Sequence, residues 1–147
     1  MSLFFAINGP YVAPSTDTPI DVKHPGKDQA VMALVADPQV SNYMFKRYPV
    51  FTAACEDLHN AQCDIDALIG AGDITENAFA MEYQLVYDGL SGIEGCRYIS
   101  ATGNHDIRLR AYSQSKARFN EFANALNNNE NPVSEFHFTE EVNGYKF

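Results

Sequence analysis

Residues 96–106 read Cys-Arg-Tyr-Ile-Ser-Ala-Thr-Gly-Asn-His-Asp, a mainly apolar run (96–101) that passes directly into a polar turn. Strands of a buried parallel sheet have this form, and ligands of open α/β sheets bind at the carboxyl ends of such strands. The form occurs twice earlier: residues 30–36 end before Asp37-Pro38-Gln39, and residues 66–71 end before Gly72-Asp73. The three stretches predict three core strands, and the uninterrupted apolar run at residues 30–36 predicts that the first of them is buried on both faces.

Apolar side chains at helical spacing follow each predicted strand. The spacing predicts a helix over about residues 45–61, a second behind Asn77 as its N-terminal cap, and a third that stops in Asn127-Asn128-Asn129. Alternation of strand and helix implies right-handed crossovers and a mostly parallel sheet. The sequence therefore predicts an α/β fold whose three strand ends share one edge.

The two ends of the chain depart from this alternation. Residues 8–29 hold four of the seven prolines, which marks residues 1–29 as a lead-in segment and residues 30–147 as the domain. Asn143-Gly144 follows a strand-like stretch at residues 136–142 and predicts a two-residue β-hairpin. The returning residues 145–147 are short for a partner strand, so we expect the domain to be truncated here and to continue beyond residue 147.

Composition narrows the class of protein. With 147 residues, 46% of them hydrophobic, the chain can form one globular core. A net charge of −9 argues against binding duplex nucleic acid through phosphate neutralisation alone. No apolar stretch approaches the roughly 18–20 residues of a membrane helix, so we expect no membrane partner and a cytoplasmic location. Cys55, Cys63 and Cys96 lack close pairing and are expected to be reduced, buried thiols.

The polar residues at the three strand ends indicate a function more strongly as an ordered set than any one motif does alone. Asp before Pro and Gly before Asp are ordinary at strand exits and tight turns. Gly103-Asn104-His105-Asp106 is more specific, because a turn has no use for His and Asp directly after Gly-Asn. The intervals from Asp37 to Asp73 and from Asp73 to Asn104 are 36 and 31 residues, each about one strand-helix unit.

In this order the motifs resemble the calcineurin-like metallophosphoesterase family, whose sequence order is Asp-x-His, then Gly-Asp-x-x, then Gly-Asn-His followed by Asp or Glu. The resemblance covers residues 30–147 and is closest at residues 72–77 and 103–106. It implies a four-layer α/β/β/α sandwich, of which this chain would hold the first half. It also implies hydrolysis of phosphomonoester or phosphodiester substrates at a dinuclear metal centre with a metal-bridging hydroxide.

The resemblance implies a role for individual residues of this sequence. Asp37 and the amide of Gln39 would bind one metal, Asp73 would bridge both metals, and Asn104 would bind the second. A shared carboxylate reduces the repulsion between two divalent cations about 3.5–4 Å apart. His105 would be the general acid that faces the leaving-group oxygen, and Asp106 would hydrogen-bond its imidazole.

Two departures from the family pattern affect the metal centre. Gln39 stands where the family more often has His, and because an amide oxygen is a harder ligand than imidazole we expect manganese to be favoured over iron or zinc for the two divalent ions. The Gly-His-x-His motif of the family's C-terminal half is absent, and His24, His59 and His137 match none of the missing ligands.

Two other readings remain open at this stage. The chain could be a non-catalytic interaction domain that keeps the fold without a competent dinuclear centre, a reading that Gln39 and the missing histidines motivate. It could also hold a single cation whose role is to fasten the strand ends together. In each case an unpaired sheet edge would favour a homo-oligomer of the chain.

Overall fold

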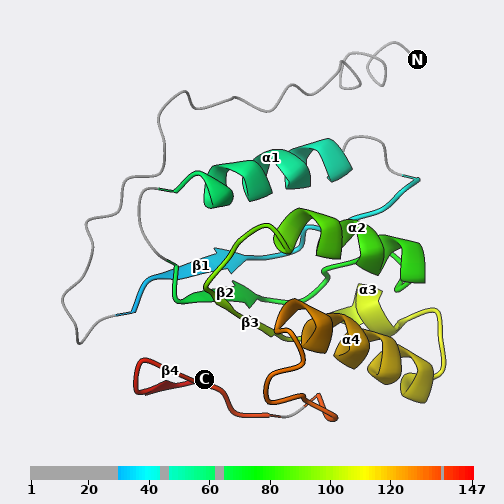
Figure 1. Ribbon diagram of the computed structural model, residues 1–147. Helices are drawn as coiled ribbons and strands as arrows, with labels where there is room; N and C mark the ends of the chain where they lie inside the picture. Colours follow the sequence, from blue (N-terminus) through cyan, green and yellow to red (C-terminus); the bar gives the residue numbers. More distant parts are fainter. Residues whose placement is uncertain (1–29, 44–46, 62–64, 137) are drawn as a thin grey trace.

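A three-stranded parallel sheet forms the centre of the protein. The computed structural model describes residues 30–43, 47–61, 65–136 and 138–147. Its strands are β1 (Met32–Val35), β2 (Ala67–Gly70) and β3 (Arg97–Ser100), in the spatial order β1-β2-β3 (Figure 1). The predicted α/β class with three parallel strands is confirmed, although each strand is shorter than its apolar run. The predicted lead-in, residues 1–29, lies outside the described residues.

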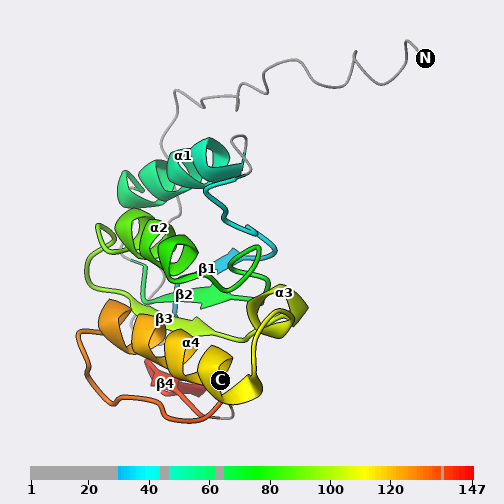
Figure 2. The same ribbon diagram turned by 90° about the vertical axis from the view of Figure 1, so that its right-hand side faces the viewer.

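Three helices cover one face of this sheet. They are α1 (Arg47–His59), α2 (Ala80–Leu90) and α4 (Tyr112–Leu126), and α2 lies between the other two (Figures 1 and 2). The predicted helical stripes are the faces that pack, as expected for amphipathic helices. The core between helices and sheet includes Phe51, Cys55, Leu68, Tyr83, Val86, Leu90, Tyr98, Phe119, Phe122 and Ala123.

The predicted C-terminal hairpin is confirmed and lies against the opposite face of the sheet. It consists of β4 (Glu141–Val142) and β5 (Tyr145–Lys146), joined by Asn143 and Gly144, whose φ values are 50° and 80°. Two left-handed residues in a row define the hairpin turn that Asn-Gly favours. Val142 is buried against Ala67 of β2 and Ile99 of β3, so the hairpin adds a second apolar layer.

Two predictions about strands are wrong in detail. The first strand is not buried on both faces, because the hairpin residue Val142 packs on β2 and β3 and leaves Leu34, on the same face of β1, 70% exposed. The stretch before the hairpin turn is mostly irregular, with only Glu141–Val142 in a strand and residue 137 outside the description.

The predicted cap of the second helix is also wrong. The N-terminal cap of α2 is Phe79 rather than Asn77. The carboxylate of Glu82, inside the first turn of α2, accepts hydrogen bonds from the backbone N–H groups of Asn77 (2.8 Å) and Phe79 (3.1 Å). A carboxylate in this position satisfies helix-end donors that a cap would otherwise serve.

Among the helices that the structure describes, none combines the length and apolar character needed to cross a membrane.

Candidate functional site

The loops that follow β1 and β2 continue side by side beyond the ends of their strands. The backbone N–H of Asp37 donates to the carbonyl of Gly72 (3.3 Å), and that of Gln39 donates to the carbonyl of Asp73 (2.9 Å). One residue further, Val40 pairs with Thr75 in an isolated parallel bridge. The structure thus brings the first two predicted motifs together at the carboxyl edge of the sheet.

Three of the four predicted metal ligands have an unusual backbone conformation. Asp37, Gln39 and Asp73 have φ values of 50°, 41° and 49°, in the left-handed region that residues other than glycine seldom adopt. Such conformations cost free energy and persist only where the surroundings enforce them, which happens most often at functional sites. Here the paired loop backbones hold all three.

The third motif is attached to the second through Asp73. Residues Asn104–Ile107 form the one-turn helix α3, and the N–H of His105 donates to Oδ1 of Asp73 (2.9 Å). A Cβ on Gly103 would lie 2.0 Å from that same oxygen, so the close approach of the two loops requires glycine. Asp73 therefore lies between the Gln39 loop and the helix that carries Asn104.

The donor set suits a hard divalent cation. Asp37, Gln39, Asp73 and Asn104 offer two carboxylates and two amide oxygens, and none of these residues is buried. All-oxygen sets of this kind favour magnesium, calcium or manganese. Within the described ranges, no group of three or more His, Cys, Asp or Glu side chains could hold a metal; the expected set contains only two such residues.

Asp106 does not have the contacts that the sequence predicted. Its carboxylate is fully buried and accepts hydrogen bonds from the N–H groups of Ile74 (3.2 Å), Thr75 (2.9 Å) and Gly103 (2.9 Å) and from the hydroxyl of Thr75 (2.8 Å). The predicted hydrogen bond to the imidazole of His105 is thus wrong. Asp106 joins the loop after β2 to the loop after β3.

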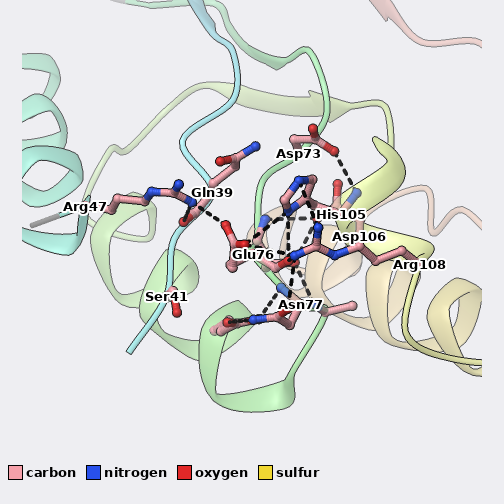
Figure 3. Close-up of polar contacts among 12 residues, drawn as sticks. Gln39, Ser41, Arg47, Asp73, Glu76, Asn77, His105, Asp106 and Arg108 are labelled. Atoms are coloured by element: carbon pink, nitrogen blue, oxygen red, sulfur yellow. Dashed lines mark hydrogen bonds and ion pairs between the residues drawn. The ribbon is translucent and has the colours of Figure 1, made fainter. Parts of the chain in front are cut away.

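The imidazole of His105 is held by Glu76 and Arg108 instead (Figure 3). Its Nδ1 lies 2.9 Å from the carbonyl oxygen of Glu76 and 3.5 Å from Oε1 of the same residue. Its Nε2 lies 3.2 Å from Nη1 of Arg108. Because a carbonyl only accepts and a guanidinium only donates, the proton of the ring is on Nδ1 in this arrangement.

Glu76 is the centre of a charged cluster that sequence reasoning missed. Its side chain is 11% exposed and pairs with Arg47 of α1 through Oε2 and with Arg108 through Oε1 (2.9 Å). Figure 3 shows the two arginines on opposite sides of this carboxylate. The signal was present in the sequence: Glu76 lies three residues after Asp73, and Arg108 three residues after His105.

In comparisons with known proteins, no family model matches the sequence, and no curated protein is significantly similar to it. The case for a function therefore rests on the geometry of these three loops.

Proposed function

We propose that the chain is a metal-dependent phosphoesterase and that its three-stranded sheet and hairpin are the first half of a four-layer α/β/β/α sandwich. The observation that carries the proposal is the position of Asp73. Its carbonyl pairs with Gln39, and its carboxylate accepts the N–H of His105, so the residue joins all three motifs. A carboxylate in this place can bind one metal ion together with the loop of Gln39 and a second metal ion together with Asn104.

Asp37, Gln39, Asp73 and Asn104 would hold two divalent ions, with manganese favoured over iron or zinc because every donor is an oxygen atom. Such ions supply Lewis acidity, which lowers the pKa of a water molecule and neutralises charge on a phosphoryl group. The buried Asp106 carboxylate fastens the loop after β2, which carries Asp73, to the loop after β3, which carries Asn104.

His105 would act on the leaving-group oxygen through Nε2. Its Nδ1–H is anchored to the carbonyl of Glu76, which fixes the plane of the ring. To donate a proton, Nε2 must first gain one, and Arg108 must move away from that nitrogen. A general acid placed in this way contributes roughly 10²–10⁴-fold to the rate.

Hydrolysis of p-nitrophenyl phosphate and bis-p-nitrophenyl phosphate tests this function. We expect turnover that requires manganese and that falls by about 10² or more in His105→Ala. His59→Ala is the matched control, because His59 is exposed on α1 and contacts only the carbonyl of Gly92 within the part of the chain that the structure describes. Turnover that is unchanged in His105→Ala would contradict the proposal.

A second candidate function is a non-catalytic interaction domain. The contact of Arg108 with His105 Nε2 favours it, because the nitrogen needed for catalysis already has a partner. In that case the wild-type protein would show no metal-dependent turnover of either substrate, and His105→Ala would leave any partner binding unchanged.

A further inference from the structure

The cluster around Glu76 carries more positive charge than its carboxylate can neutralise. One buried carboxylate faces two guanidinium groups, those of Arg47 and Arg108. His105 accepts a hydrogen bond from Arg108 at Nε2 and adds no positive charge in this arrangement. Among these three side chains the guanidinium groups therefore exceed the carboxylates by one, while the carboxylates of Asp73 and the buried Asp106 lie on the neighbouring residues His105 and Thr75.

The two arginines also keep hydrogen-bond donors in reserve. Their side chains are 36% and 37% exposed. Among the described residues, Arg47 bonds only through Nη1, to the carbonyl of Gln39 (3.4 Å) and to Glu76, which leaves Nε and Nη2 unused. Arg108 uses Nη1 and Nη2 and leaves Nε unused. These unused N–H groups can donate hydrogen bonds to the oxygen atoms of an anion.

The guanidinium groups of Arg47 and Arg108 lie beside the residues proposed to act on a phosphoryl group. Arg108 is in contact with Nε2 of His105, and Arg47 is in contact with the backbone of Gln39, a proposed metal ligand. Figure 3 shows Glu76 between them, with Asp73 and His105 close by. An anion bound to both guanidinium groups would therefore border the proposed reaction site.

We propose that Arg108, assisted by Arg47, recognises the dianionic phosphoryl group of phosphomonoesters and makes them the preferred substrates over phosphodiesters. This inference rests on the proposed phosphoesterase function. A monoester has three non-bridging oxygens and two negative charges, whereas a diester has two such oxygens and one charge. Guanidinium forks bind paired phosphoryl oxygens, so the third oxygen of a monoester gives them a partner that the diester lacks.

Binding of this kind also frees the catalytic nitrogen. When Arg108 turns from His105 to the phosphoryl oxygens, Nε2 loses its hydrogen-bond donor and can take up from solvent the proton that it must carry to the leaving group. Glu76 keeps Arg47 as its ion-pair partner during this exchange. Without substrate, Arg108 blocks Nε2 of His105, and a bound monoester would remove this block by taking Arg108 as its own partner.

Two ligands without a hydrolysable ester bond test the inference: phenylphosphonate, the analogue of a monoester, and methylphenylphosphinate, which has the two oxygens and single charge of a diester. Their dissociation constants are measured by calorimetry with and without manganese, above the pH at which the phosphonate carries two charges. We expect the wild-type protein to bind phenylphosphonate about tenfold or more tightly than the phosphinate. The preference should largely disappear in Arg108→Gln and persist in part in Arg108→Lys.

Lys116→Gln is the matched control, because it removes one positive charge and one ion pair, that with Glu135 (2.6 Å), on α4. We expect it to keep the wild-type preference. Arg108→Gln retains the Arg47–Glu76 pair, and its melting temperature verifies that it is folded. An unchanged preference in folded Arg108→Gln, with manganese still improving binding, would overturn this inference alone. If manganese had no effect while Arg108 remained necessary for the preference, the phosphoesterase proposal would fail and the anion site would stand.

Discussion

At the scale of single residues, His105 and Asp106 show what adjacency in sequence can and cannot predict. Their motif correctly indicated a place where the third strand ends. The predicted bond between their side chains failed because both lie on α3, and consecutive helical residues do not face each other. His105 extends to Glu76, whereas Asp106 is buried beneath the loop after β2. The directions of the His105 and Asp106 side chains are set by α3, and a helix of a single turn is too short to produce a periodic pattern in the sequence.

Asp106→Ala should destabilise the protein far more than an ordinary surface substitution. The change leaves the buried N–H groups of Ile74 and Thr75, the Thr75 hydroxyl and the half-buried N–H of Gly103 without their acceptor. Each buried donor left without an acceptor typically costs about 1–3 kcal/mol. Urea unfolding measures the loss, with Asp57→Ala on the exposed side of α1 as the control. Equal stability of the two variants would show that Asp106 does not fasten the loops.

At the scale of elements, the periodic spacing of apolar residues predicted the presence of the helices well but predicted the residues at which they begin less well. Apolar spacing identifies the face of α1, α2 or α4 that packs on the sheet, since burial of that face is what the pattern encodes. The start of α2 was missed because the N–H group of its cap residue Phe79 is satisfied by Glu82, a residue inside the helix. The exposure of β1 was missed because local sequence does not specify which strands the hairpin packs on.

The packing of helices on the sheet should make stability depend on alkaline pH. Burial raises the pKa of the Cys55 thiol from 9.0 to about 12, and it also raises the pKa of the Tyr83 and Tyr98 hydroxyls above 10.0. Above these ordinary values the unfolded chain releases protons that the folded protein keeps. Stability is therefore fully present below about pH 9 and falls as the pH rises toward 12.

Urea unfolding at about pH 8 and about pH 10.5 checks this dependence, and we expect a lower free energy of unfolding at the higher pH. Cys55→Ser removes one of the groups that lose protons, so the decrease should be smaller in that variant. The same free energy at both pH values would contradict the burial of these groups.

At the scale of the whole molecule, the two faces of the sheet are covered unequally. The helices shield one face, and the hairpin shields β2 and β3 on the other. On β1 the side chains of Met32 and Leu34 remain 39% and 70% exposed. The sequence correctly predicted the hairpin turn, but the extent of its cover depends on the tertiary packing of Val142, which a local pattern does not specify.

The exposed side chains of β1 should make the protein associate with itself at high concentration, because exposed apolar edge strands pair readily. Leu34→Glu should return the protein to a monomer in sedimentation velocity runs over a range of concentrations. Met81→Glu is the control, since Met81 is 58% exposed on α2, away from the sheet edge. Equal association of both variants would show that β1 is not the contact.

Calorimetric titration of the metal-free protein with manganese determines whether Asp73 joins two metal-binding halves at the edge of the sheet. Two ions per chain are predicted for the wild type, with saturable binding lost in Asp73→Asn and kept in Asp57→Asn, which alters an exposed carboxylate of α1. Absence of saturable binding to the wild type, or equal binding by wild type and Asp73→Asn, would contradict this role of Asp73.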